Sequence, residues 1–145
     1  MVGGGEIAAR KISLLCRAHA DVTVVSPAVS VATARLIETH QLELISREYR
    51  SSDVLGRTLI VSATDIEAVN RQVFEDATAA GLLVNSVDMP VLSNVIFPAL
   101  IDRSPVVVAV STGGASPTLA RIVRSWIEAR LPARLGSLAA VSYTH

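Results

Sequence analysis

The sequence predicts an α/β fold in which a parallel sheet carries helices on both faces. Half of the 145 residues are hydrophobic and only 3% are aromatic, so Val, Ile, Leu and Ala must build the core, as in buried parallel strands. Short apolar runs alternate with segments of helical periodicity, which is the βαβ pattern. A glycine-rich segment, Gly3-Gly4-Gly5, opens the first helical segment. Together these observations favour a Rossmann-like arrangement.

The periodicity also predicts the elements of the first part of the chain. Ile7, Lys11, Leu14 and Leu15 have helical spacing directly after the glycines. A second helix is expected at about 29–40, and strands are expected at 22–26, 42–46, 58–63 and 82–86. The run at 58–63 is almost wholly apolar, so this strand should be central.

A third helix is expected between the last two of these strands. Thr64-Asp65-Ile66-Glu67 fits a capping box, in which Thr64 would cap a helix that continues to about Ala80. Gly81 should stop this helix, because glycine readily adopts the left-handed conformation that ends many helices.

The alternation breaks after Asp88-Met89-Pro90. Apolar runs at 95–97, 100–101 and 106–110 follow one another without a helix between them, and such runs pair by hairpins or between subunits. Ser116 and Pro117 predict the N-cap and first residue of another helix. Leu131-Pro132 should end it, and one more helix is expected at 134–141. The face expected to be buried consists of Leu119, Ile122, Val123, Trp126 and Ile127.

Charge, cysteine and histidine content exclude several classes of protein. Lys plus Arg (13) balances Asp plus Glu (13), so the chain lacks the positive charge expected of nucleic-acid or anionic-membrane binding. The single Cys16 excludes an intramolecular disulfide and favours a reducing, cytoplasmic compartment. No apolar run approaches the ~18 residues of a membrane span, and no signal peptide is visible. His19, His40 and His145 lack metal-site spacing, so no metal site is expected.

The glycine segment has the pattern Gly3-x-Gly5-x-x-Ala8. Such glycines permit a tight turn and let the backbone approach a pyrophosphate at the positive end of a helix. The alternative is an ordinary glycine turn without a ligand. Only Met1 and Val2 precede the pattern, so the first strand, which should be central in the sheet, is expected to be largely missing.

The residues expected to meet the adenosine side of a dinucleotide are Ser26-Pro27-Ala28. They follow the second strand of the pattern, where an acidic residue often binds the ribose of NAD. No carboxylate is present, and no arginine is present for a 2′-phosphate, so NAD is favoured over NADP. A strand ending in a proline turn is the alternative.

Asp88 follows the strand at 82–86, at the edge of the sheet where ligands bind in parallel α/β folds. Its apolar neighbours could tune its proton affinity for general acid/base catalysis. A turn-forming aspartate before Pro90 is the alternative. Asp65 and Asp102 are interpreted as structural, because one lies in a first helical turn and the other in a local turn.

A second glycine loop, 112–117, precedes the helix that begins at Pro117. Its backbone N–H groups and the hydroxyls of Thr112 and Ser116 form a plausible site for carboxylates or phosphate. An ordinary capped helix with a flexible entry is the alternative.

Together these motifs resemble the amino-terminal part of the siroheme synthase family, which contains precorrin-2 dehydrogenase and sirohydrochlorin ferrochelatase. The resemblance covers essentially the whole chain in order. Its motifs are Val2-Gly-Gly-Gly-Glu-Ile-Ala-Ala-Arg-Lys11, Ser62-Ala-Thr-Asp65, Asn85-Ser-Val-Asp-Met-Pro90, Phe97-Pro98, Ile101-Asp-Arg-Ser-Pro105 and Ser111-Thr-Gly-Gly-Ala-Ser-Pro-Thr-Leu-Ala-Arg121.

The resemblance implies NAD-dependent oxidation of precorrin-2 to sirohydrochlorin, followed by insertion of Fe²⁺ as a substrate to give siroheme, in a homodimer. Asp88 would be the acid/base of both reactions. It further implies an NAD-binding Rossmann-like domain at 1–90 and, at 91–145, a small α+β dimerisation region with the start of a truncated helical segment. The implied cofactor residues are Gly3, Gly4, Gly5, Glu6, Ile7, Ser26, Pro27, Ala28 and Thr64, and the implied substrate residues are Asn85, Thr112, Gly113, Gly114 and Ser116.

Two other functions are compatible with parts of the pattern. An NAD-sensing regulatory module would share the glycine segment, but such modules usually keep the acidic ribose-binding residue and lack counterparts of the motifs at 85–90 and 112–117. The other alternative is an inactive fragment of the enzyme. Family members continue into a helical segment, and some into a methyltransferase domain, beyond the last residue here.

Overall fold

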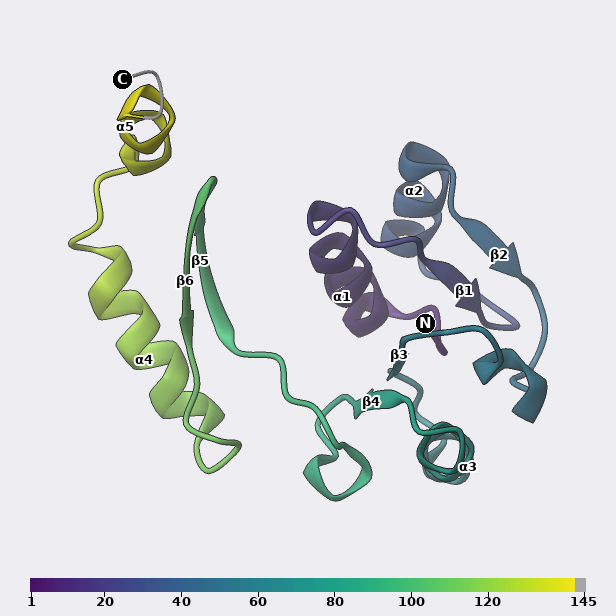
Figure 1. Cartoon of the computed structure of the whole chain (residues 1–145). Coiled ribbons are helices and arrows are strands. Elements are labelled where there is room, and N and C mark those ends of the chain that lie inside the picture. Colours follow the sequence, from purple (N-terminus) through teal and green to yellow (C-terminus); the bar gives the residue numbers. More distant parts are fainter. Residues whose placement is uncertain (143–145) are drawn as a thin grey trace. The chain divides into compact units, whose positions relative to one another are not determined.

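The computed structural model describes residues 1–142, and the side chains of residues 1–138, as two compact units, Met1–Val95 and Ile96–His145. Helices and strands alternate in the first unit, as the periodicity predicts (Figure 1). Its elements are α1 (Glu6–Arg17), β1 (Thr23–Val25), α2 (Val31–His40), β2 (Glu43–Ile45), the 3₁₀ turn η1 (Ser51–Val54), β3 (Leu59–Ser62), α3 (Glu67–Ala79), β4 (Leu83–Ser86) and the 3₁₀ turn η2 (Pro90–Leu92).

Val2 joins the two strand pairs of this unit into one parallel arrangement. β1 pairs with β2 and β3 pairs with β4, each in parallel, while Val2 forms parallel bridges to both Val25 and Ser62. The Val2 N–H donates to the Val61 carbonyl and the Val25 N–H donates to the Met1 carbonyl, both at 2.8 Å. The spatial order is therefore β2, β1, Val2, β3, β4, which confirms the Rossmann-like fold and places the short first strand at its centre.

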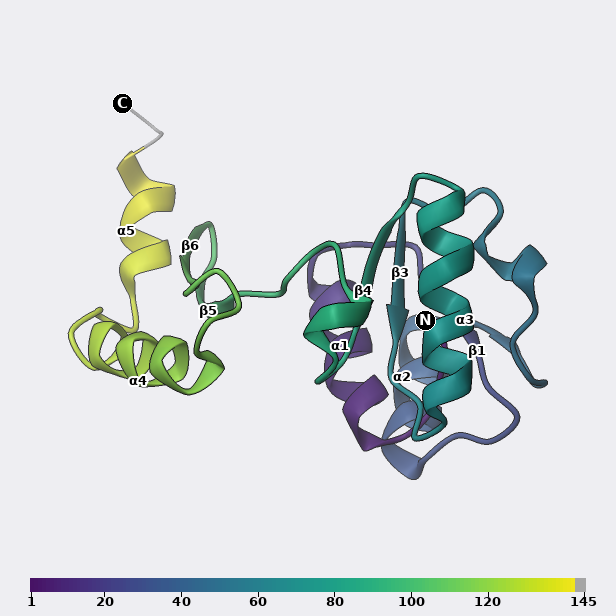
Figure 2. The ribbon, with the colours of Figure 1, turned by 90° about the horizontal axis from the view of Figure 1, so that it is seen from below.

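Helices cover both faces of these strands (Figure 2). On one face, Val73 and Ala77 of α3 pack with Ile60 and Val84. On the other, Ile12 of α1 packs with Val22 and Val24, and Leu36 and Ile37 of α2 join this cluster. The alternation of side chains along each strand explains why the two clusters lie on opposite faces.

The expected capping box at Thr64 is wrong. The N-cap of α3 is Ile66, and among the described residues no side chain caps it. The Thr64 hydroxyl instead accepts a hydrogen bond from the Ile66 N–H at 3.2 Å, which makes a local turn before the helix. Threonine competes in this way for nearby backbone groups, so the capping pattern alone did not identify the helix start.

The second unit contains the antiparallel hairpin of β5 (Ala99–Arg103) and β6 (Val106–Val110), followed by α4 (Pro117–Glu128) and α5 (Leu135–Ser142). The hairpin and both helices were predicted, but the expected strand at 95–97 is wrong. The backbone N–H groups of Asn94 and Val95 donate to the Val84 carbonyl, which ties this segment to the end of β4. Pro98 then precedes the hairpin, and proline cannot donate to a strand ladder.

The apolar stripe of α4 is only partly covered, because Val123 and Ile127 are half-buried while its other three residues are exposed. Ser116 caps α4 through the Leu119 N–H, as predicted, but the side chains of Leu119, Ile122 and Trp126 are 48%, 43% and 61% exposed. Ala120 is the buried residue of this helix, and Arg124 donates to the Leu100 carbonyl of β5 at 3.1 Å. A two-stranded hairpin is too narrow to cover the whole helix, so this hairpin leaves part of the apolar surface of α4 uncovered.

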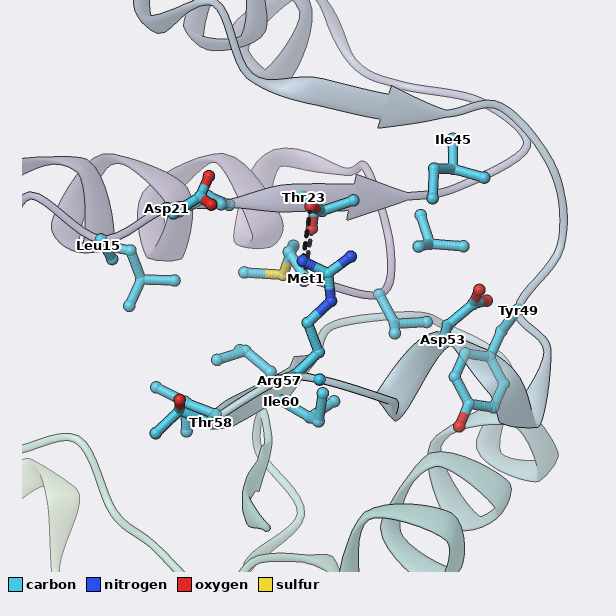
Figure 3. Close-up of a pocket in the computed structure, with 17 residues that line it drawn as sticks. Met1, Leu15, Asp21, Thr23, Ile45, Tyr49, Asp53, Arg57, Thr58 and Ile60 are labelled. Carbon is cyan, nitrogen blue, oxygen red and sulfur yellow. Dashed lines mark hydrogen bonds between the residues drawn. The ribbon is translucent and has the colours of Figure 1, made fainter. Parts of the chain in front are cut away.

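A cavity of about 430 Å³ lies between β1 and β3 (Figure 3). Its walls include Met1 and the first residues of the two strands, Thr23 and Leu59. Arg57 reaches across and donates to the Thr23 hydroxyl at 3.0 Å. The cavity is at the amino ends of the strands, opposite the edge where the predicted site lies. Val2, which bridges β1 and β3 at the centre of the sheet, also lines this cavity.

Candidate functional site

The glycine segment is held tightly against two neighbouring loops. Gly3 has φ +105°, and a Cβ added to it would lie 2.3 Å from the Ala63 carbonyl oxygen. A Cβ on Gly4 would lie 2.4 Å from the Ala28 carbonyl oxygen, whereas one on Gly5 would meet nothing within 4 Å. Gly3 and Gly4 are therefore required by packing, and Gly5 borders open space.

The amino end of α1 faces this open space. Gly5 is its N-cap, and among the side chains that the structure describes none caps this helix by a hydrogen bond. Gly5, Glu6 and Ile7 are all exposed. Free N–H groups and the positive helix end together suit a phosphate group. The predicted pyrophosphate-binding residues thus fit a dinucleotide.

Two residues that the sequence analysis missed hold the glycine segment in place. The Ser30 N–H donates to the Gly4 carbonyl at 2.8 Å, and the fully buried Thr33 hydroxyl donates to the Gly5 carbonyl at 3.1 Å. Ser30 also caps α2 through the Thr33 N–H. The signal available in the sequence was a serine three residues before a threonine at a helix start.

The residues expected near the adenosine lie beside the same turn. The buried Ser26 donates its hydroxyl to the Ala28 carbonyl at 2.6 Å, while Pro27 and Ala28 are exposed. Thr64 lies on the other side, with its Cγ2 atom 3.2 Å from the position of a Cβ on Gly3. The structure therefore gathers all the predicted cofactor residues around the amino end of α1.

Asp88 occupies an exposed turn at the carboxyl end of β4. The Met89 N–H donates to the Ser86 carbonyl at 3.1 Å, and Asp88 has φ +59°. Aspartate tolerates this left-handed conformation better than most residues. The hydroxyl of Ser93, also missed from the sequence, donates toward the carbonyls of Ser86 and Met89 and accepts the Ser86 N–H. The backbone of the turn and the Ser93 hydroxyl thus make the hydrogen bonds that fix it.

Lys11 of α1 lies within electrostatic range of Asp88. Burial lowers the pKa of Lys11, and the negative charge of Asp88 acts in the opposite direction. The helix that starts at the glycine segment therefore brings a cation toward the turn that carries the candidate acid/base.

Asn85, expected to bind substrate, is buried, and its Nδ2 donates to the Val95 carbonyl at 2.9 Å. This bond links the end of β4 to the segment that follows η2. The amide nitrogen of Asn85 therefore has a structural role next to the Asp88 turn.

The second glycine loop belongs to the other unit, Ile96–His145. The Thr112 hydroxyl accepts the Ser116 N–H and donates to the Ser116 carbonyl, both at 3.0 Å. Gly113 and Gly114 have φ of +64° and +85°. The loop is a closed turn that leads into α4, and a threonine provides the hydroxyl that closes it.

In the part of the chain whose side chains are described, no group of three or more His, Cys, Asp or Glu residues could hold a metal ion. His145 lies outside the described residues. Of the described helices, none is long and apolar enough to cross a membrane.

Comparison with known proteins identifies the family. Residues 1–99 match a family model described as putative NAD(P)-binding, and residues 103–130 match one described as sirohaem biosynthesis protein central. The chain belongs to the siroheme synthase family. It is 51% identical over 141 residues to a siroheme synthase of Thioalkalivibrio sulfidiphilus and 46% identical over 142 residues to one of Pseudomonas aeruginosa.

These alignments cover 97% and 98% of this chain, but only 29% and 30% of the two siroheme synthases. The chain thus spans about 30% of the length of these relatives. Among solved structures, the precorrin-2 dehydrogenase SirC matches with a TM-score of 0.79 and 30% identity, over 99% of this chain and 70% of SirC. The resemblance to the siroheme synthase family that the sequence motifs predicted is confirmed.

Proposed function

We propose that this chain oxidises precorrin-2 to sirohydrochlorin with NAD⁺. The observation that carries the proposal is the match to SirC, which is named a precorrin-2 dehydrogenase, over 99% of this chain. The family model described as NAD(P)-binding and the open amino end of α1 support the choice of cofactor.

The proposed cofactor residues act by position and by backbone charge. The N–H groups of Gly5, Glu6 and Ile7 receive the pyrophosphate, and Gly3, Gly4 and Thr64 shape the turn beneath it. Ser26, Pro27 and Ala28 meet the adenosine side. When bound, NAD⁺ would accept a hydride, which is one proton together with two electrons, from the substrate. Because residues 26–28 include no cation for a 2′-phosphate, NAD⁺ is preferred over NADP⁺.

Asp88 is the proposed proton acceptor. Oxidation of precorrin-2 removes two hydrogens, one with the electron pair and one as a proton, and the exposed carboxylate of Asp88 takes the proton. Asn85, Thr112, Gly113, Gly114 and Ser116 are proposed to contact the tetrapyrrole, whose carboxylates suit loop N–H groups and hydroxyls.

We also propose that the same carboxylate serves iron insertion, with Fe²⁺ as a substrate. Two pyrrole N–H protons must leave as one Fe²⁺ enters, so this step again requires a proton acceptor at the macrocycle. A single exposed carboxylate can serve both reactions in turn.

The proposed assembly is a cytoplasmic homodimer formed through the second unit. Three observations support the dimer. Leu119, Ile122 and Trp126 of the apolar stripe of α4 are exposed, β6 exposes Val107 at 55%, and within the described residues the hairpin of β5 and β6 has no third strand. Exposed strand edges and apolar faces of this kind are normally covered. The single Cys16 is consistent with a reducing compartment.

The proposal is tested by incubating the purified chain with precorrin-2 and either NAD⁺ or NADP⁺. We expect NADH and sirohydrochlorin to form in equal amounts, with tighter calorimetric binding of NAD⁺ than of NADP⁺. Binding of NAD⁺ without turnover would instead support a regulatory module. No binding of either cofactor would support an inactive fragment.

A further inference from the structure

Asn70 is a buried amide whose hydrogen-bonding capacity is fully used. It lies in the first turn of α3 and is 4% exposed. An asparagine side chain has two N–H donors and an oxygen with two lone pairs. The hydroxyls of Ser62 and Thr64 donate to Oδ1, at 2.5 and 3.0 Å. Nδ2 donates to the Thr64 carbonyl at 2.9 Å and contacts the Met89 sulfur at 3.7 Å.

These partners belong to two different walls of the candidate site. Thr64 lies in the loop 63–66, against which Gly3 packs so closely that an added Cβ would be 2.3 Å from the Ala63 carbonyl oxygen. Met89 is the residue directly after Asp88. One side chain therefore contacts both the loop beneath the proposed cofactor and the turn that carries the proposed proton acceptor.

Helix capping does not explain this arrangement. An asparagine near a helix start commonly caps the helix, yet among the described residues no side chain caps α3, and the amide of Asn70 is directed to the loops. Burial of an amide costs free energy unless its groups are hydrogen-bonded. The buried Val73, one turn further along α3, provides packing without any such bonds.

We propose that Asn70 is a positioning residue that holds the loop 63–66 and the Asp88 turn at one fixed spacing. The role rests on the proposed function, because the two walls meet cofactor and substrate only if NAD⁺ binds at the glycine segment. Displacement of either wall must break hydrogen bonds of the Asn70 amide. A movement that a ligand causes at one wall is therefore transmitted to the other wall through this amide.

The kinetic test compares three variants. Asn70→Ala should raise the KM for NAD⁺ about tenfold and lower kcat about tenfold, because both walls lose buried hydrogen bonds. Ser93→Ala, which loosens only the Asp88 turn, should lower kcat with little change in KM. Val73→Ala removes core packing from the same helix and should lower the Tm without changing either constant at temperatures below its unfolding. Unchanged kinetics in Asn70→Ala, or equal effects in Val73→Ala, would overturn the proposal.

A second test does not depend on activity. The chain has two methionines, Met1 and Met89, so a ¹³C-methyl label gives two resonances, and Met1, remote at the other end of the strands, serves as a reference. In Asn70→Ala without cofactor, the Met89 methyl shift should move toward its unfolded value, and in Val73→Ala it should not.

Saturating NAD⁺ should shift the Met89 resonance in the parent chain and should not shift it in Asn70→Ala. An unchanged Met89 resonance in the free variant, or an unaltered response to NAD⁺, would overturn the role of Asn70. Failure of the parent chain to bind NAD⁺ would overturn the proposed function, and the cofactor-free spectra would still decide whether Asn70 holds the Asp88 turn.

Discussion

Ser93 contacts both backbone polar groups of Ser86. The Ser93 hydroxyl accepts a hydrogen bond from the Ser86 N–H at 3.0 Å, and it lies 3.2 Å from the Ser86 carbonyl oxygen. Ser86 begins the turn that carries Asp88. The geometry of this turn therefore depends on Ser93 and on the backbone, and the carboxylate of Asp88 can be changed chemically without dismantling it.

We predict that Asp88→Asn keeps the fold and NAD⁺ affinity but loses about 10²–10⁴-fold in the rates of sirohydrochlorin and siroheme formation. Asparagine tolerates the left-handed conformation at this position but cannot accept a proton. Calorimetry and product assays measure the two effects separately. Turnover within about threefold of the parent would support a purely structural Asp88. Loss of oxidation with intact chelation would show that the reactions do not share it.

Gly4→Ala and Gly5→Ala should separate stability from cofactor binding. A Cβ on Gly4 would lie 2.4 Å from a backbone oxygen, so this variant should lose about 1–3 kcal/mol of folding free energy. A Cβ on Gly5 meets no protein atom but occupies the space proposed for the pyrophosphate. Gly5→Ala should keep its Tm within about 2 °C and bind NAD⁺ about tenfold more weakly. Unchanged affinity in Gly5→Ala would place the pyrophosphate elsewhere.

The double variant Ile122→Glu with Trp126→Glu should weaken the dimer at least about 10²-fold, because both residues lie on the exposed apolar face of α4 and central aromatic anchors carry much of the binding energy. Light scattering measures the effect. Leu55→Glu is the matched control, since Leu55 is an exposed apolar residue, at 70%, of the first unit. A parent chain that is monomeric at micromolar concentration would contradict the proposed assembly.

Asp53 should make stability depend on acid pH. Arg47 binds both of its carboxylate oxygens, at 2.7 and 2.8 Å, and the Asp53 side chain is 8% exposed. The hydrogen bond from Arg47 is the largest cause that lowers the pKa of Asp53. Because the folded pKa lies below the unfolded value, the stabilisation is present above the unfolded pKa of about 4 and is lost as pH falls through the folded pKa.

Asp53→Asn should therefore lower stability by about 1–3 kcal/mol at pH 7, and this difference should shrink as the pH falls from about 4 toward 2. Thermal unfolding across this pH range measures the difference. Glu67→Gln is the control, because the pair of Glu67 with Arg71 is 65% and 55% exposed and should contribute little at any pH. Parallel pH profiles for parent and Asp53→Asn would refute the assignment.

The cavity beside Met1 predicts that an added apolar strand will stabilise the chain. A short extension rich in Val and Ile before Met1 would fill part of the roughly 430 Å³ between β1 and β3. Each well-buried side chain contributes about 1.5–3 kcal/mol, so we expect a Tm higher by about 5–10 °C and tighter NAD⁺ binding. A Gly-Ser extension of equal length is the control. Equal Tm values for the two extensions would contradict this account.

The order of elements, the glycine turn and the position of Asp88 were readable from the sequence. Each of these features is determined by residues close together in the sequence. The signals were the apolar periodicity, the Gly3-x-Gly5 spacing and the position of Asp88 just after a strand. The family resemblance extended this to the reaction proposed. The local sequence pattern gave a wrong prediction at two places. Thr64 was predicted to cap a helix but forms a turn before it. The apolar run at 95–97 was predicted to be a strand, but its first residue is hydrogen-bonded to β4 instead.

Only the tertiary structure decided which residues support the site. Thr33, Asn70 and Ser93 hold the glycine segment, the loop 63–66 and the Asp88 turn through hydrogen bonds between segments brought together by folding. A buried hydroxyl or amide in a helix looks like any other polar residue in the sequence. Its role is set by the partner that burial forces it to find, and that partner is defined by the packing of the whole unit.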